Sequence, residues 1–251
     1  METIEDLIEY LESKDKTVLP KTLPLENQLY GMMALTLPFD LSKDYYLLQD
    51  RILIEERRKR EVVLPSSLPF RKGRIRLFSG DITTLLIDAI VCPGNKELLG
   101  CFIPNHNCLD NQIHTRAGLE VRRDLLIEKE RRGSYLPGDV VPTKGYCLPC
   151  TYIFHVLGPQ IQGKVPTEEE KEDLGRCYRN CLVLAEREKI SSIAFPAIST
   201  GVFGFPKKEA CFIAVSSVRR YLEENPSTGL EQIVFSVFGE EDKEYYEQAI
   251  L

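Results

Sequence analysis

The stretch from Gly100 to His114 concentrates residue types that bind metal ions. Cys101, His106 and Cys108 lie close together here, although the whole chain has only eight cysteines and three histidines. Two thiolates and one imidazole suit Zn²⁺, and three protein ligands leave one tetrahedral position open, as in catalytic rather than structural zinc sites. The alternative is two small buried cysteines and a hydrogen-bonding loop histidine. The spacing alone does not decide between these two interpretations.

Polar residues and glycines that follow predicted strands are a second set of candidates, because ligands of open α/β sheets lie beyond the carboxyl ends of the strands. Asp81 can accept a hydrogen bond from an amine, although, taken alone, capping of the next turn explains it better. Asn95 suits a ribose hydroxyl, but an ordinary turn would also use it. Ser199–Pro206, STGVFGFP, can offer backbone N–H groups to phosphate oxygens at a helix N-terminus, although such a loop is more often a simple turn.

The elements that must position these residues begin at Gly73, where β-prone runs alternate with helical patterns. Strands are predicted in RIRLF, DAIVC, YIFHVLG, SIAFPAI and QIVFSVF. Helices are predicted from Asp110 to about Arg131, from Thr167, after Pro206, and over Lys243 to Ile250. This alternation predicts an α/β sandwich with helices on both faces of a largely parallel sheet.

The first part of the chain has a different texture. Residues 1–70 are predicted to be a helical extension, and LPSSLPF, with its two prolines, marks a boundary before a domain at 73–251. The composition, 43% hydrophobic and 28% charged, is that of an ordinary globular protein. A net charge of −6 argues against binding of nucleic acid through its phosphates.

Membrane and export signals are not expected. No apolar stretch approaches the length that spans a membrane. The opening METIEDLIEYLESKD is acidic and has no apolar segment of a secretory signal. We therefore expect a cytoplasmic protein whose cysteines are reduced, so that metal binding or burial explains them better than disulfides.

The order of several motifs resembles the macrodomain family. These motifs are G-D-I-T, an Asn followed by x-x-L-L-G, L-D-N-x-I-H-x-x-A-G, P-G-D-V, G-Y-x-L-P, Y-I-x-H-x-x-G-P and S-T-G-V-F-G-F-P. The resemblance covers residues 73–251 and implies a three-layer αβα sandwich with a mixed, largely parallel sheet. Macrodomains bind ADP-ribose, and many remove it from proteins, so the resemblance implies the same ligand here.

The resemblance also implies a role for each matching residue. Asp81 would contact the adenine amine, and Ile82 would contact the adenine ring through its backbone. The diphosphate would be held by Ser199, Thr200, Gly201, Val202 and Phe203. Phe238 would stack on adenine, with core packing as its alternative role. Asn95 and Asp110 would lie at the distal ribose.

Two departures indicate a zinc-containing branch of that family. Val91–Asn95 reads V-C-P-G-N where hydrolytic macrodomains typically read V-N-A-A-N, and the glycine run that usually follows is replaced by C-F-I-P-N-H-N-C. The replacement resembles the G-C-F-x-P-x-H-x-C stretch of that branch. The resemblance therefore implies one catalytic Zn²⁺ per chain, held by Cys101, His106 and Cys108. It also implies a lipoylated carrier protein as partner and a sirtuin-class ADP-ribosyltransferase encoded nearby.

The remaining thiols and imidazoles have structural explanations. Cys147 and Cys150 form a C-x-x-C that could be a rival zinc or redox site, but the matching family segment begins a strand far from the chemistry. Cys177 and Cys181 lie on the buried face of a predicted helix. His155 is expected to be a structural strand histidine, and His114, on one helical face with Asp110, supports the site or a hydrogen-bond network.

The predicted activity is a zinc-dependent hydrolase that removes mono-ADP-ribose from carboxylate-linked protein side chains. Zn²⁺ would polarise a ribose hydroxyl or activate water, Asp110 would orient or deprotonate that water, and Asn95 would hold the ribose. Asp110 is also expected to cap its helix. The alternatives are a non-catalytic ADP-ribose-binding module, a phosphatase on ADP-ribose phosphate, and a deacetylase on O-acetyl-ADP-ribose.

Overall fold

The sheet of the computed structural model, which describes residues 1–163 and 165–251, is mixed and largely parallel, as predicted. Within these residues seven strands pair in the order β1-β2-β7-β6-β3-β5-β4. They are β1 Phe70–Lys72, β2 Ile75–Ser79, β3 Ile87–Gly94, β4 Val140–Lys144, β5 Cys150–Leu157, β6 Ser192–Phe195 and β7 Gln232–Val237. The five central strands are parallel, and β1 and β4 pair antiparallel at the two edges.

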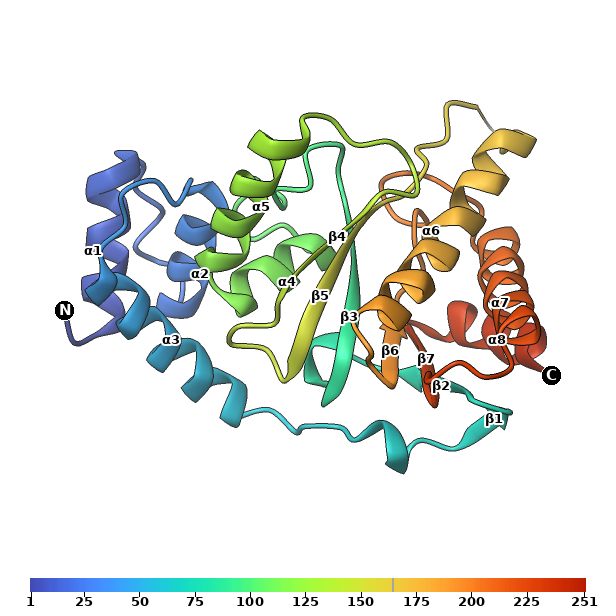
Figure 1. Ribbon diagram of the computed structural model, residues 1–251. Helices are drawn as coiled ribbons and strands as arrows, with labels where there is room; N and C mark the ends of the chain where they lie inside the picture. Colours follow the sequence, from blue (N-terminus) through green and yellow to red (C-terminus); the bar gives the residue numbers. More distant parts are fainter. Residues whose placement is uncertain (164) are drawn as a thin grey trace.

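Helices cover both faces of this sheet, so that the molecule has the predicted three layers (Figure 1). On one face lie α4 and α5, and on the other lie α6, α7 and α8, each group with its own apolar core. Their bounds are α4 Leu109–Ala117, α5 Leu119–Arg132, α6 Glu168–Arg187, α7 Lys207–Glu224 and α8 Glu240–Ile250. The predicted capping box at Thr167 and Glu170 is present at the start of α6.

The prediction of one helix from Asp110 to Arg131 is wrong. Gly118 separates α4 from α5 and has a φ of 107°, a backbone conformation that residues other than glycine rarely adopt. A Cβ here would also lie 2.7 Å from Nε2 of Gln49. The break therefore makes room for a contact from the N-terminal helices and lets α4 and α5 point in different directions.

The N-terminal helices lie outside α4 and α5 (Figure 1). They are α1 Ile4–Asp15, α2 Leu25–Leu35 and α3 Lys43–Arg58. Their buried apolar side chains form a third core that includes Leu119 of α5 and Cys147. The division of the chain at residues 70 and 73 stays a prediction, but the shared core shows that these helices are packed on the rest of the molecule.

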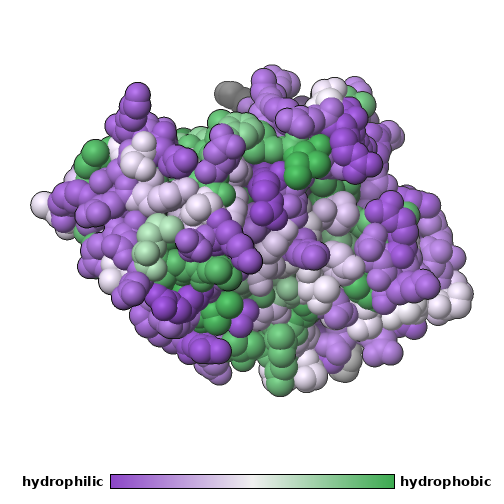
Figure 2. All heavy atoms as spheres, turned by 60° about the vertical axis from the view of Figure 1, so that its left-hand side comes forward, coloured by the Kyte–Doolittle hydropathy of each residue, from purple (hydrophilic) through white to green (hydrophobic). Residues whose placement is uncertain are grey.

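The surface of the N-terminal side is mainly hydrophilic. Figure 2 brings this side forward and shows apolar groups in smaller areas between polar ones. The apolar faces of α1, α2 and α3 are turned into the shared core instead. None of the described helices has both the length and the apolar character that crossing a membrane requires.

Candidate active site

The loop of residues 95–108, here called the β3–α4 loop, brings the three predicted metal ligands together. Its end is tightly turned: Asn105 has a φ of 53°, and the Cys108 N–H donates to the His106 carbonyl at 2.9 Å. The Cys101 Sγ lies 3.4 Å from the His106 Nδ1. The donor atoms of Cys101, His106 and Cys108 all lie within 4.8 Å of one another, and the three residues are half-buried.

The first turn of α4 supports this loop. The Cys108 Sγ accepts a hydrogen bond from the Asn111 N–H at 3.4 Å, which makes Cys108 the N-cap of the helix. The Asn111 side-chain amide donates to the carbonyls of Ile103, at 3.0 Å, and Cys101, at 3.5 Å. The prediction that Asp110 caps this helix is therefore wrong, because Asp110 lies inside the first turn and its side chain is buried in the interior.

The chemistry of these donors fits a metal ion. Burial, opposed by the Asn111 N–H and reinforced by the neighbouring Cys101 and Asp110, raises the pKa of Cys108 to about 12. Two adjacent thiolates are therefore unfavourable unless a cation lies between them. A divalent ion with soft-ligand preference, such as Zn²⁺, satisfies that requirement, and three ligands leave a coordination position free.

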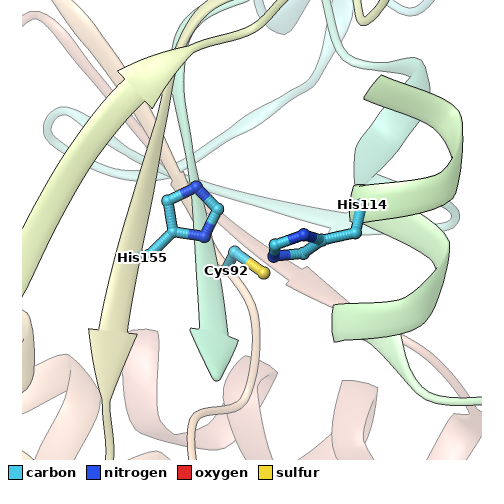
Figure 3. A group of neighbouring side chains, drawn as sticks. All are labelled: Cys92, His114 and His155. Atoms are coloured by element: carbon cyan, nitrogen blue, oxygen red, sulfur yellow. The ribbon is translucent and has the colours of Figure 1, made fainter. Parts of the chain in front are cut away.

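A buried group behind Asp110 was not singled out from the sequence. Cys92 of β3, His114 of α4 and His155 of β5 converge here, and their potential ligand atoms also lie within 4.8 Å of one another (Figure 3). The Cys92 thiol donates to Asp110 Oδ1 at 3.5 Å, and His114 Nε2 lies 3.3 Å from the same oxygen. These three residues lie far apart in the sequence, on two strands and a helix, so no sequence motif links them and only the fold brings them together.

The two imidazoles of this buried group have lowered pKa values. Burial lowers the pKa of His155 to about 3, and burial, His155 and Arg122 lower the pKa of His114 well below its ordinary value. Both imidazoles are therefore neutral, and His155 Nε2 is already 3.0 Å from the Thr143 hydroxyl. The group lines the interior behind Asp110 with weakly polar, uncharged partners.

Asp110 itself is poised to exchange a proton near neutral pH. Burial raises its pKa to about 7, although the Cys92 hydrogen bond and the positive charge of Arg122 oppose the shift. A carboxyl group with such a pKa is present in both protonation states at neutral pH, as a general acid or base requires. Asp110 contacts Cys92 and His114, follows Cys108 by two residues and acts on the Cys108 thiol through its charge, so this carboxyl group lies near the candidate metal site.

Asn95 organises the start of the β3–α4 loop. Its Nδ2 donates to the Gly100 carbonyl at 3.0 Å, and its Oδ1 accepts from the Glu97 N–H at 2.9 Å. These are the contacts of the turn residue that the sequence left as an alternative. An amide has two N–H donors and an oxygen with two lone pairs, so one donor and one acceptor position stay available to a ligand.

Asp81 and Phe238 lie at neighbouring strand ends. Ser79 of β2 is paired with Val237 of β7, and the Gly80 N–H donates to the Val237 carbonyl at 3.1 Å. The residues that follow, Asp81 and Phe238, are therefore adjacent at the same edge of the sheet. The Phe238 ring is 85% exposed, so its alternative role in core packing is wrong.

Asp81 is held by a cation and a hydroxyl. The Arg116 Nη1 lies 2.5 Å from its Oδ2, and the Thr83 hydroxyl and N–H donate to its Oδ1 at 2.7 and 3.0 Å. Burial raises the pKa of Asp81, but Arg116 and these hydrogen bonds outweigh it and hold the pKa below its ordinary value. Asp81 is thus an ionised acceptor. Ile82, which follows it, is buried.

The loop after β6 holds a strained residue at its start. Ser199 has a φ of 65°, its hydroxyl is buried without a hydrogen-bond partner, and a Cβ on Gly158 would lie 2.2 Å from that hydroxyl. The Thr200 hydroxyl donates to the Ala197 carbonyl at 3.0 Å, and the Phe205 N–H donates to Ser199 O at 2.9 Å. Backbone strain of this kind is kept where the surrounding structure imposes it, commonly at ligand sites.

The tip of the same loop is open. Val202 is 81% exposed, whereas Phe203 packs partly against the core and its carbonyl accepts from the Ile161 N–H at 3.0 Å. A Cβ on Gly201 would meet nothing within 4 Å, which indicates space above the loop.

The other cysteines have structural surroundings. The Cys147 thiol donates to Asp50 Oδ1 of α3 at 3.3 Å, and Cys150 begins β5. In the part of the chain that the structure describes, neither belongs to a group of three close potential ligands. Cys177 and Cys181 are buried in the core beneath α6, which confirms their prediction.

Comparisons with known proteins agree with this architecture. The family model described as Macro domain matches residues 91–214. A protein named protein-ADP-ribose hydrolase from Staphylococcus aureus is 40% identical over 250 residues, 98% of this chain and 92% of that protein. The Oceanobacillus iheyensis macrodomain with ADP matches with a TM-score of 0.63 at 34% identity, over 71% of this chain and 90% of that one. The Trypanosoma brucei macrodomain in complex with ADP-ribose matches with a TM-score of 0.68 at 26% identity, over 94% and 100%.

Proposed function

The chain belongs to the macrodomain family, and we propose that it is a zinc-dependent hydrolase that removes mono-ADP-ribose from modified protein side chains. The relative named protein-ADP-ribose hydrolase aligns over nearly its whole length, which supports ADP-ribose as the ligand and hydrolysis as the reaction. The single observation that carries the metal requirement is the half-buried group of Cys101, His106 and Cys108, whose potential ligand atoms lie within 4.8 Å of one another.

ADP-ribose would lie across the carboxyl-terminal edge of the sheet. The ionised Asp81 would accept from the adenine amine, the Ile82 backbone would contact the ring, and the exposed Phe238 would stack on it. The diphosphate would lie on the loop of Ser199, Thr200, Gly201, Val202 and Phe203. The distal ribose would then reach the β3–α4 loop. This pose is supported by adjacent strand ends and by the space above Gly201.

The residues at the distal ribose would divide the chemistry among them. The remaining donor and acceptor of the Asn95 amide would orient a ribose hydroxyl. Asp110, with a pKa of about 7, would take the proton of the attacking water and later release it to solvent, while the carboxylate leaves as an anion. Cys101, His106 and Cys108 would hold Zn²⁺, which supplies Lewis-acid polarisation of oxygen at the ribose.

The leaving group in this proposal is a side-chain carboxylate. A carboxylate leaves as an anion and needs no general acid. Asp110 as the base and Zn²⁺ as the Lewis acid would therefore be sufficient for this step. The macrodomain resemblance implies a lipoylated carrier protein as the modified partner, and we retain that partner as part of the proposal.

The test is release of ADP-ribose over time from two modified proteins, one with a glutamate ester and one with a serine linkage. We expect zinc-loaded protein to release ADP-ribose from the ester and to leave the serine linkage intact. Binding of ADP-ribose without release from either substrate would instead identify a binding module. Turnover of O-acetyl-ADP-ribose with no release from protein would identify a deacetylase, and turnover of ADP-ribose phosphate alone would identify a phosphatase.

A further inference from the structure

Arg122 of α5 places a guanidinium in the interior, where it is 1% exposed. Its Nη1 donates to the carbonyls of Met33, Ala34 and Thr36 at 2.8, 3.1 and 2.6 Å. These carbonyls belong to the last turn and the C-cap of α2. The carbonyls at a helix C-terminus lack intrahelical partners and carry a partial negative charge, so the end of α2 solvates this buried cation.

The same guanidinium holds the β3–α4 loop. Its Nε donates to the Leu99 carbonyl at 2.8 Å, and its Cζ lies 4.4 Å from the centre of the Phe102 ring. Leu99 and Phe102 lie on either side of Gly100 and Cys101 in the sequence. Arg122 therefore contacts the backbone before the first proposed metal ligand and the aromatic side chain after it.

A second contact between α2 and the same loop does not involve Arg122. A Cβ on Gly31 would lie 3.0 Å from Asn105 Nδ2, 3.5 Å from Pro104 Cβ and 2.5 Å from Leu19 Cδ1. The backbone of α2 thus passes against the two residues that precede His106. Because Asn111 of α4 supports the loop from its other side, the loop is held between α4 and the N-terminal helices.

We propose that Arg122 is a positioning residue for the Cys101–His106–Cys108 group, and that α2 is for this reason part of the hydrolytic site. The inference rests on the proposed function, since it concerns the geometry of the same three ligands. Its physical basis is that one planar guanidinium with several fixed donors joins α2, Leu99 and Phe102 at once. An arrangement of supporting contacts around metal ligands of this kind sets their orientation and their affinity for the ion.

Arg122→Lys is the test variant, because lysine keeps the charge but its single ammonium cannot reach Leu99 and the end of α2 together. Arg123→Lys is the matched control: it is the next residue of α5, and its guanidinium lies 5.2 Å from the Tyr46 ring of α3, away from the loop. Gly31→Val is a second, independent variant, which crowds Asn105 from α2 and leaves Arg122 intact.

Three quantities are measured on full-length protein: zinc release to a coloured chelator, the visible absorption of the Co²⁺-substituted form, and kcat for release of ADP-ribose from the ester substrate. For Arg122→Lys and Gly31→Val we expect zinc release and kcat to change by roughly 10- to 100-fold, as for other supporting residues of metal ligands. The Co²⁺ bands should shift in both. The affinity for free ADP-ribose should stay within about threefold of wild type, because adenine and diphosphate lie on other loops.

The outcomes separate the two proposals. Wild-type zinc release, Co²⁺ spectrum and kcat in a folded Arg122→Lys would overturn the role of Arg122. If Arg122→Lys does not fold, unchanged values in Gly31→Val would overturn the role of α2 by itself. Equal changes in Arg123→Lys would also overturn it, since they would show only a general effect of docking the N-terminal helices. A wild-type protein that binds no zinc, or hydrolyses the ester without it, would remove the proposed function and the inference together.

Discussion

Cys108 has two roles, because its sulfur caps the N-terminus of α4 and is also a proposed ligand of the metal ion. Cys108→Ser separates them. A serine hydroxyl is a good N-cap, so the free energy of unfolding should stay within about 1 kcal/mol of wild type. An alcohol is a poor zinc ligand, so the variant should lose most of its zinc and its hydrolysis while it keeps affinity for ADP-ribose.

Elemental analysis of the purified variant, together with calorimetry for ADP-ribose, checks this prediction. Zinc near one ion per chain is expected in wild type. If zinc remains in Cys108→Ser and leaves only after replacement of Cys147 and Cys150, the C-x-x-C pair is the metal site and our ligands are wrong.

Gly201 is where a charge should act on the diphosphate alone. It has no positive φ, and a Cβ there would meet nothing within 4 Å, so Gly201→Glu should fold normally. A carboxylate at the proposed diphosphate site repels the ligand and fills its space, so binding should fall at least about 100-fold. Gly229→Glu, which has equal room in another part of the chain, is the control and should bind as wild type. Undiminished binding in Gly201→Glu would remove Ser199–Phe203 from the site.

The exposed ring of Phe238 gives a prediction about adenine. Phe238→Ala should weaken ADP-ribose binding by about 1–3 kcal/mol, as the loss of an aromatic platform for a base does. The melting temperature should hardly change, because the ring is exposed. Titration calorimetry measures the affinity for ADP-ribose and, for comparison, for ribose 5-phosphate, and a thermal melt measures the melting temperature. A loss of equal size for ribose 5-phosphate, which has no base, would contradict stacking.

At the scale of elements, the contact between α3 and α5 includes a buried carboxyl group. Glu120 accepts a hydrogen bond from the Gln49 Nε2 at 2.8 Å, yet burial raises its pKa to about 7. This folded-state pKa lies above the unfolded value of about 4.3, so the stabilising contribution is fully present below about pH 4.3 and is lost as pH rises through about 7. The docking of α3 is therefore weakened by ionisation of Glu120.

Glu120→Gln should remove the loss of stability that ionisation of Glu120 causes, because the amide oxygen still accepts a hydrogen bond from Gln49 and carries no charge. The gain in unfolding free energy over wild type should be larger at pH 8 than at pH 5 by about 1–3 kcal/mol. Denaturant titration at both pH values measures it, and Glu130→Gln on the exposed side of α5 is the control. A gain that does not differ between the two pH values would mean that Glu120 is not buried as described.

The elements themselves were largely predictable from the sequence, and the exceptions have physical reasons. Alternation and β-branched runs identified the five parallel strands, because burial on both faces leaves a strong apolar signal. The edge strands β1 and β4 were missed, since both are short, β1 reads F-R-K and β4 contains a proline and a lysine. The break at Gly118 was missed, because the contact with Gln49 for which it makes room comes from a segment that is remote in sequence.

At the scale of the whole molecule, the closeness of the three proposed metal ligands could be predicted from the sequence, because these residues are close together in the chain. The Cys92–His114–His155 group and the contacts of Arg122 join segments from α2 to β5, and no single-sequence spacing encodes them. The role of residues 1–70 was open for the same reason. The structure shows that these residues pack on the rest of the molecule through the shared core and that carbonyls of α2 accept hydrogen bonds from Arg122.

The strand order has a consequence for how the protein is made. The ribosome delivers β2 early, yet its parallel neighbour β7 is the last strand to emerge. The side of β2 that faces β7 therefore waits, unpaired, through the synthesis of about 150 residues, and pairing of such sequence-distant strands is intrinsically slow. Throughout that interval the nascent chain carries an open sheet edge, and such edges recruit other chains. Expression at lower temperature, or with chaperones that bind extended segments, should therefore raise the soluble yield more than any change in the metal supplied to the cells.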